Sequence, residues 1–255
     1  MSKLRLASVN IERDRHLDPV LLFLSEYKPD VVCIQELMKR DIRFFERKLG
    51  ATSIYVGNTR HPAEGKPGVM GLGIFSTLPI RSHAVEYYGG SVGKLVDFDH
   101  TSLETRRTTE NRTVLHCGIE KAGVSFRIAT THFAWTPDGL PSDFQREDLG
   151  GILAILEQMD EFVLCGDFNA PRKGEIFGRL AARYKDNIPA KYNWSVDLDL
   201  HRRGRAHLEQ EAARVGLSGF MVDGLFTTPR YSAKDVELHN GISDHCAITA
   251  TIEVV

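Results

Sequence analysis

The stretch Phe162-Val163-Leu164-Cys165-Gly166-Asp167-Phe168-Asn169 places two polar side chains directly after a short apolar run. The run 162–165 is typical of a fully buried β-strand, and Gly166 leaves the backbone room to approach another segment closely. Because strand residues two apart point the same way, Asp167 and Asn169 should project together. Such a pair can hold a water on one side and a phosphate oxygen on the other. The structural alternative is an Asx turn that closes the strand.

Polar residues also stand at the edges of other apolar runs along the chain. Taken singly, each has an ordinary explanation, since acids at strand ends are commonly solvated and lone histidines are more often structural. Their recurrence is harder to explain by structure alone, because loops at strand ends are where sites are usually built. The set comprises Asn10, Glu12, Glu36, His132, Asp223, Asp244 and His245, in addition to Asp167 and Asn169.

Asp223 lies inside the apolar segment 221–225, where an unpaired carboxylate would be costly. A histidine is a natural partner, and His245 is the candidate. In such a pair the imidazole would be held protonated or in a fixed orientation, near its ordinary pKa of about 6.5. Asp244 and His245 precede the apolar run 246–254 as neighbours, so we expect their side chains to point to opposite sides and to serve different purposes.

The acids in this set suit a hard cation. Mg²⁺ takes few protein carboxylates, keeps several waters and accepts phosphate oxygens from its substrate. One or two acids at strand ends, such as Glu36, would therefore suffice for a magnesium site.

Strand-like and helix-like segments alternate along the whole chain, without repeats and without a linker rich in glycine, serine or proline. The sequence contains about a dozen strands but only about four helices, which is too many strands for a simple doubly wound sheet. We therefore predict one α/β (α+β) domain over residues 1–255, with two packed mixed sheets flanked by helices. Loops are predicted over 89–111 and 189–207. Helices are predicted over 16–27, 40–49 and 142–159, and strands over 4–9, 31–34, 53–56, 69–75, 80–85, 112–119, 124–130, 162–165, 222–226 and 246–254.

Composition narrows the class of protein. Hydrophobic residues at 42% and charged residues at 26% are typical of a globular protein and exclude disorder, collagen and coiled coil. The net charge of −2 argues against a protein that coats nucleic acid by bulk positive charge, although a local basic groove is compatible with it. The four cysteines, Cys33, Cys117, Cys165 and Cys246, stand in apolar contexts and are predicted to be buried thiols.

The cysteine pattern indicates a reducing compartment. The N-terminal segment reaches Glu12 before any long apolar stretch develops, which is unlike a signal peptide. No run approaches the roughly 18 apolar residues of a membrane span. We therefore expect a cytoplasmic protein with no membrane association, and infer no obligate protein partner.

A few residues are candidates for determining substrate specificity. Trp135 could stack on a base, a contact worth about 1–3 kcal/mol, or pack at the rim of the site. Arg202 and Arg203, in the basic run 201–205, could guide a phosphate backbone or lie in a solvated loop. Arg112 follows a polar loop and could reach a phosphate or pair with a loop acid.

With these residues in place, the chain resembles the endonuclease/exonuclease/phosphatase superfamily, whose fold is that of DNase-I-like proteins. The matching segments occur in the family's order over residues 7–245, and the GDFN element at 166–169 and the SDH element at 243–245 are the specific ones. The resemblance implies a four-layer sandwich with the site at one end. The supporting segments are 7–10, 34–36, 71–76, 130–133 and 221–223.

The resemblance also implies how a metal would be held. Glu36 is similar to the family's main Mg²⁺ ligand, and Asn10 to the residue that assists it. Glu12 resembles an accessory acid, and Asp244 would support the metal or His245. Mn²⁺ is expected to be able to replace Mg²⁺.

For the reaction itself, the resemblance implies that Asp167 orients or activates the attacking water. His245, paired with Asp223, would stabilise the transition state or polarise water, and the choice of base between Asp167 and His245 stays open. Asn169 and His132 would contact the phosphate. In-line attack of this kind needs a positioned water and positive charge near the equatorial oxygens.

These features predict a Mg²⁺-dependent phosphodiesterase that acts on nucleic acid, at ends or on single strands. The first alternative is a phosphatase for inositol phosphates or another small phosphorylated ligand, and a remote one is a non-catalytic binding scaffold. The segment 219–222 lacks the tryptophan-rich signature of exonuclease-III-like repair enzymes, which argues against repair of abasic sites. The absence of a signal peptide and of disulfide candidates argues against secreted sphingomyelinases and secreted DNase I.

Overall fold

Strands and helices alternate along the chain in the computed structural model, which describes residues 2–255. Its twelve strands are β1 (Lys3–Asn10), β2 (Val31–Met38), β3 (Thr52–His61), β4 (Gly68–Ser76), β5 (Ile80–Gly89), β6 (Arg112–Lys121), β7 (Val124–His132), β8 (Val163–Asp167), β9 (Lys185–Asp186), β10 (Asp223–Thr227), β11 (Tyr231–His239) and β12 (Ala247–Val254). Its helices are α1 (Leu17–Tyr27), α2 (Ile42–Leu49), α3 (Leu103–Thr109), α4 (Asp143–Glu157), α5 (Glu175–Ala181) and α6 (Arg205–Arg214), with short 3₁₀ helices at η1 (Lys39–Asp41) and η2 (Ala63–Gly65).

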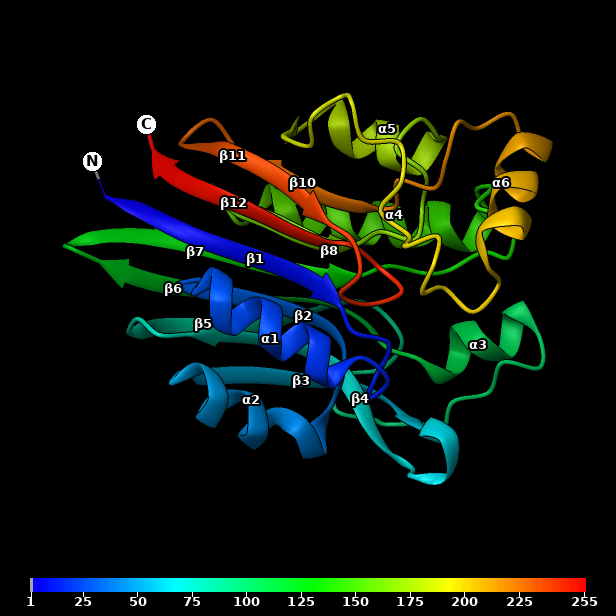
Figure 1. The fold of residues 1–255 in the computed structure, drawn as a ribbon, viewed down its shortest axis with the longest axis horizontal. Helices are drawn as coiled ribbons and strands as arrows, with labels where there is room; N and C mark the ends of the chain where they lie inside the picture. Colours follow the sequence, from blue (N-terminus) through cyan, green and yellow to red (C-terminus); the bar gives the residue numbers. More distant parts are fainter. Residues whose placement is uncertain (1) are drawn as a thin grey trace.

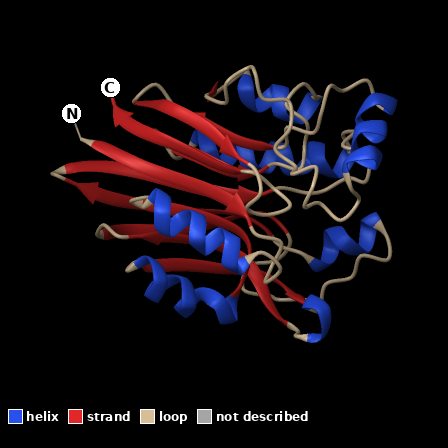
Figure 2. Ribbon diagram, viewed as in Figure 1, coloured by secondary structure: helices blue, strands red, loops and turns tan. Residues whose placement is uncertain are grey.

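Two six-stranded mixed sheets pack face to face (Figures 1 and 2). The first has the strand order β11-β12-β1-β2-β4-β3, and the second has the order β5-β6-β7-β8-β10-β9. Buried side chains of α1 and α2 pack on the outer face of the first sheet, and those of α4 and α5 pack on the outer face of the second. The predicted four-layer α/β sandwich is therefore confirmed.

The central strands are apolar on both faces because both faces are covered. In β2, Val31 and Cys33 point into the core between the two sheets, whereas Val32 and Ile34 point to the layer of α1 and α2. This double burial explains why such strands appear in the sequence as continuous apolar runs rather than alternating ones. The four cysteines of the chain are buried free thiols, as predicted.

Several elements differ from the predictions. The predicted loop 89–111 contains α3, a seven-residue helix with a capping box at Ser102 and no buried residue, so it lacks the apolar stripe that marks a helix in a sequence. The predicted loop 189–207 ends inside the first turn of α6. The elements α5, α6, β9 and β11 were not predicted, and the strand predicted over 31–34 continues to Met38.

The two ends of the sandwich differ in character. The N and C termini lie side by side at one end, and loops together with α3 and α6 gather at the other (Figure 1). The strand pairs β1–β2 and β7–β8 are parallel, so their carboxyl ends meet at the loop-rich end. This is where the polar strand ends identified in the sequence come together.

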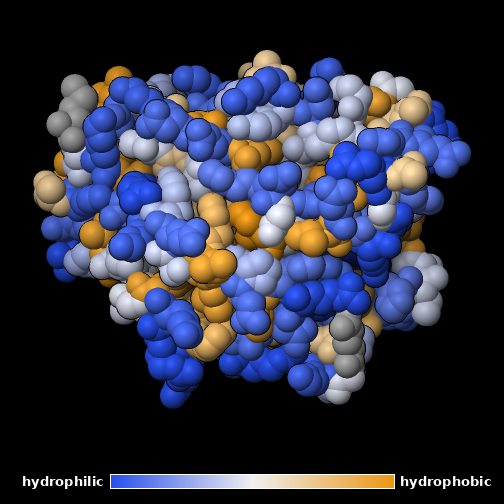
Figure 3. Space-filling model, viewed as in Figure 1, coloured by the Kyte–Doolittle hydropathy of each residue, from blue (hydrophilic) through white to orange (hydrophobic). Residues whose placement is uncertain are grey.

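Polar side chains predominate on the face of the molecule shown in Figure 3, with hydrophobic ones interspersed. On α1, the hydrophobic side chain of Leu22 is 62% exposed. None of the helices within residues 2–255 has the length and apolar content needed to cross a membrane.

Candidate active site

Strand register places three predicted site residues side by side. Asp167 is the last residue of β8, and its partner in the parallel strand β7 is His132. Its partner in the antiparallel strand β10 is Asp223. Residues far apart in the sequence are thus brought together by backbone pairing alone, on either side of a central carboxylate.

The carboxylate of Asp167 uses its two oxygens differently. Its Oδ1 accepts a hydrogen bond from the backbone N–H of Asn169 at 2.8 Å, which is the Asx turn considered for this sequence. Its Oδ2 accepts from Nδ2 of Asn10 at 3.1 Å and lies 3.5 Å from Nε2 of His132. The turn and a chemical role are therefore compatible, because the turn occupies one oxygen and leaves the other facing polar groups.

His245 is held by a buried carboxylate. Its Nδ1 lies 2.8 Å from Oδ2 of Asp223, and its Nε2 lies 3.8 Å from Oδ2 of Asp167. Burial alone would lower the pKa of His245, but the charges of Asp223 and Asp167 raise it well above its usual value. The imidazole is therefore favoured in its protonated form, with Nε2 directed toward Asp167.

Asn169 joins this cluster from the loop after β8. Its Nδ2 donates to the carbonyl oxygen of Phe133 at 2.9 Å, which orients the side chain along the wall of the site. Its backbone has a positive φ of 47°. Glu12, Arg13 and Glu36 also have positive φ, and such non-glycine backbone commonly gathers at functional sites.

Glu36 projects from inside β2 rather than from its end. The pairing of β2 with β4 shifts register between Ile34 and Leu37, and Glu36 lies in this bulge with a φ of 55°. Its Oε1 accepts from Nδ2 of Asn10 at 3.4 Å, and its Oε2 lies 2.9 Å from Nη1 of Arg13. Although burial raises the pKa of Glu36, the positive charges of His132 and Arg13 hold it below its usual value.

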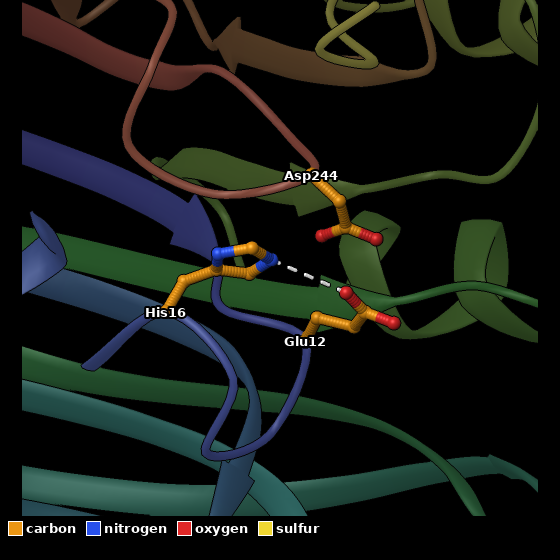
Figure 4. A group of neighbouring side chains, drawn as sticks. All are labelled: Glu12, His16 and Asp244. Atoms are coloured by element: carbon orange, nitrogen blue, oxygen red, sulfur yellow. Dashed lines mark hydrogen bonds and ion pairs between the residues drawn. The ribbon is translucent and has the colours of Figure 1, made fainter. Parts of the chain in front are cut away.

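A second group of acids lies beside Glu36. Glu12 follows β1, and Asp244 belongs to the loop before β12, so the two come from opposite ends of the chain (Figure 4). His16 faces Glu12, with 3.3 Å between Nε2 and Oε2, and one ligand atom from each of the three residues lies within 4.8 Å of the others. Burial, together with the charges of Glu12 and Glu36, raises the pKa of Asp244 to about 7.

These residues fit a hard divalent cation. The carboxylates of Glu12 and Asp244, with that of Glu36 nearby, are oxygen donors of the kind that Mg²⁺ prefers. The pKa of Asp244 is raised by burial and by repulsion from nearby carboxylates. A bound cation would reduce this repulsion. Glu12, Glu36 and Asp244 would hold the metal. Asn10 was also predicted as a ligand, but its Oδ1 accepts from the backbone N–H of Glu12 at 3.1 Å and its Nδ2 donates to Glu36 and Asp167, so it would position these carboxylates.

The acids open into a cleft of about 260 Å³. Its walls include Trp135, Arg202 and Arg203, which were predicted to contact the substrate. The ring of Trp135 lies against two guanidinium groups, 4.6 Å from Arg106 and 5.8 Å from Arg203. The guanidinium of Arg203 is also paired with Glu211 at 2.6 Å.

Arg112, which was predicted to bind the substrate, lies outside the cleft. Its side chain is 5% exposed and does not line the cleft, and Nη1 lies 2.8 Å from Oε2 of the buried Glu110. The pairing with a loop acid that the sequence allowed is the arrangement present. Glu110 in turn lies 3.9 Å from Nδ1 of His132, so Arg112 neutralises an acid behind the site instead of reaching for a phosphate.

Several charged residues of the cleft were missed in the sequence. The run 12–15 carried a signal for Arg13, because two arginines flank an acid there. The capping box at Ser102 was a signal for α3 and hence for Arg106. The residues concerned are Arg13, His61, Arg106, Glu110 and His201.

Comparison with known proteins identifies the family and the fold. The model of the Endonuclease/Exonuclease/phosphatase family matches residues 7–245. No curated protein matches the chain. Among solved structures, an endonuclease/exonuclease/phosphatase from Bacteroides vulgatus is similar with a TM-score of 0.72 at 17% identity, covering 100% of both chains.

Two further structures share the fold. The human Nocturnin catalytic domain, solved with a bound sulfate anion, has a TM-score of 0.70 at 16% identity, covering 99% of this chain and 94% of its own. TDP2 from D. rerio, solved with a single-strand DNA product, has a TM-score of 0.66 at 15% identity, covering 100% of both chains. At these identities the similarity establishes the fold and leaves the substrate open.

Proposed function

The chain belongs to the Endonuclease/Exonuclease/phosphatase family, and we propose that it is a Mg²⁺-dependent phosphodiesterase that hydrolyses nucleic acid. The observation that carries this proposal is the position of Asp167, whose Oδ2 faces Asn10, His132 and His245 at the rim of a cleft that also contains Glu36. A base, cationic groups and oxygen ligands for a metal are thus adjacent.

In the proposed reaction, water attacks phosphorus in line with the leaving oxygen, and Oδ2 of Asp167 takes the water's proton. His245 supplies a positive charge and an N–H donor at Nε2 to the phosphate oxygens, because Asp223 binds Nδ1 and favours the protonated ring. His132 and Asn169 hold further phosphate oxygens. A bound Mg²⁺ would add Lewis acidity and neutralise charge on the phosphate.

Asp167 is assigned as the base on electrostatic grounds. A proton acceptor must be unprotonated, and the same two carboxylates that raise the pKa of His245 make its ring a poor acceptor. The carboxylate of Asp167 is 1% exposed and is held by Asn10 and by its own turn. It is therefore oriented before the substrate binds.

Nucleic acid is the favoured substrate because the cleft combines aromatic and cationic groups. Trp135, Arg202 and Arg203 line the same cavity as the proposed catalytic residues, and such a combination is typical of single-stranded nucleic-acid sites. The structural similarity to TDP2, solved with a single-strand DNA product, supports this choice.

Metal dependence is tested by chelation and by Glu36→Gln. EDTA is expected to abolish hydrolysis of labelled single-stranded oligonucleotides, with recovery on adding Mg²⁺ or Mn²⁺. Because the substitution removes one ligand charge, the Mg²⁺ concentration for half-maximal activity should rise by at least about 10-fold. Glu26→Gln, on the exposed side of α1, is the control. Activity that survives EDTA would rule out the metal-dependent mechanism.

Asp223→Asn tests the orientation of His245. Since the amide cannot provide the negative charge that favours the imidazolium, kcat should fall by about 100-fold while KM changes little. Steady-state kinetics on the oligonucleotide would measure both constants, and circular dichroism would check that the fold is retained. A variant with unchanged kcat would exclude the Asp223–His245 pair from the reaction.

The substrate class is tested by a panel assayed in Mg²⁺ and in Mn²⁺. It would contain single-stranded DNA, single-stranded RNA, 5′-tyrosyl DNA and inositol phosphates. Preference for an oligonucleotide over soluble phosphomonoesters supports the proposal. The reverse preference would replace it by the small-molecule phosphatase.

A further inference from the structure

Arg106 presents a positive charge in the cleft without a carboxylate partner. It lies on α3, and its guanidinium packs 4.6 Å from the ring centre of Trp135 and 5.5 Å from that of Phe98. Among the side chains that the structure describes, no carboxylate comes within 4.0 Å of its nitrogens, and its Nε is buried without a hydrogen-bond partner. Burial lowers the pKa of Arg106 from its usual value, and the charge of Glu110 opposes this effect in part.

Four arginines near Arg106 differ from it in this respect. Arg107, the next residue, pairs with Glu147, and Arg112 pairs with Glu110. Arg13 and Arg203, which share the cleft with Arg106, pair with acids as well. Arg106 is half-buried, and its guanidinium rests on aromatic rings rather than in an ion pair. Its charge is therefore available to a ligand in the cleft.

The charge of Arg106 lies beside the proposed reaction centre but on a different wall. Arg106 lines the same cleft as Glu36 and Arg202, and the acid that interacts with it most strongly is Glu110. Phe98 links it to His61, the last residue of β3, whose ring stacks on Phe98 with 4.9 Å between centres. Asp167 and His245, by contrast, belong to the second sheet and to the loop before β12.

His61 adds a hydrogen-bond donor to this wall. Its Nδ1 accepts from the backbone N–H of Ala63 at 2.9 Å, so in the neutral ring the proton resides on Nε2. His61 also lines the cleft. A guanidinium packed over aromatic rings, with an imidazole N–H donor in the same cleft, provides the kind of donors that bind an anion.

We propose that Arg106 and His61 form a subsite for a second phosphate of the substrate, next to the phosphate that is hydrolysed. This inference rests on the proposed phosphodiesterase function and narrows its substrate to a chain end or short strand with a phosphate one unit from the scissile bond. Trp135 then acts mainly as the support of the Arg106 guanidinium, because that group already lies over its ring.

The test compares substrates with and without the second phosphate. Wild-type protein is assayed on a dinucleotide with a 5′-terminal phosphate, on the same dinucleotide without it, and on bis(p-nitrophenyl) phosphate. Arg106→Gln should raise KM for the phosphorylated dinucleotide by about 10- to 100-fold, as expected for loss of a charged hydrogen bond, and leave the other two substrates nearly unchanged. Arg107→Gln, the same change one residue along α3, should affect none of them.

Arg106→Lys guards against an effect of folding, because it retains the charge and should keep part of the preference for the terminal phosphate. The proposed subsite would be ruled out if Arg106→Gln weakened activity equally on all three substrates. It would also be ruled out if Arg107→Gln raised KM for the phosphorylated dinucleotide as much as Arg106→Gln. If the wild-type protein hydrolyses none of these substrates in Mg²⁺ or Mn²⁺, it is the phosphodiesterase function that fails.

Sulfate binding tests whether Arg106 belongs to an anion site without requiring hydrolysis. With EDTA present, inorganic sulfate should raise the Tm of the wild type and of Arg107→Gln by binding the folded protein. Arg106→Gln should need at least about 10-fold more sulfate for the same shift. An unchanged sulfate dependence in Arg106→Gln would exclude Arg106 from an anion site.

Discussion

Asp167→Asn is expected to lower kcat by about 1,000-fold, the largest effect of any substitution considered for this protein. The amide has nearly the shape of the carboxylate and can still accept the backbone hydrogen bond of Asn169 at Oδ1. It cannot accept the proton of an attacking water, and it removes the negative charge next to His132 and His245. The loss should therefore fall on the chemical step rather than on substrate binding.

Single-turnover kinetics on a labelled single-stranded oligonucleotide would separate these steps, since substrate affinity should change little. Asp30→Asn is a matched control, because Asp30 is paired with Lys121 and precedes β2 at the end of the sheets remote from the site. That variant should keep kcat close to the wild-type value. Retention of more than about a tenth of wild-type kcat in Asp167→Asn would show that another group takes the proton.

Gly166→Ala should destabilise the protein by about 3 kcal/mol or more. A Cβ at this position would lie 2.1 Å from the carbonyl oxygen of Thr131, on the neighbouring strand β7. The φ of 145° is in addition unfavourable for any residue with a side chain. Both penalties arise where β7 and β8 are parallel and the backbone cannot move without displacing His132 and Asp167 from register.

Urea denaturation would measure this effect as a lower midpoint with an unchanged slope. Gly150→Ala is the matched control, because Gly150 lies inside α4 and a Cβ there meets no atom within 4 Å. Replacing an exposed helical glycine in this way should stabilise the protein by about 0.5–1 kcal/mol. A Gly166→Ala variant within about 1 kcal/mol of the wild type would contradict the close approach of β7 and β8.

Much of the fold could be predicted from local patterns. The apolar runs at 31–34 and 162–165 indicate strands buried on both faces, and the structure covers both faces of β2 and β8. The elements that were missed have weak local signals. Helix α3 has no buried residue, and β11 is an edge strand with a largely half-exposed or exposed pattern, so neither carries the apolar periodicity on which such predictions depend.

The candidate site divides in the same way. Asp167 and His245 stand in short motifs that are visible in one line of sequence, and the structure places them 3.8 Å apart. Glu36 was identified from its place near an apolar run, but its direction depends on a bulge between β2 and β4. For Arg112 the sequence allowed either a phosphate contact or pairing with a loop acid, and the structure shows the pairing, with Glu110.

By itself, the sequence determined the class of fold and most of the side chains that the proposed chemistry requires, because apolar runs and the polar residues at their ends are local features. Asp167 is an example, since the apolar run before it and the residues of the turn after it both lie within 162–169. Only the tertiary structure decided which charges are free to meet a ligand. The difference between Arg106 and its neighbour Arg107 depends on carboxylates brought near by strands and helices distant in the chain, and no local pattern records those distances.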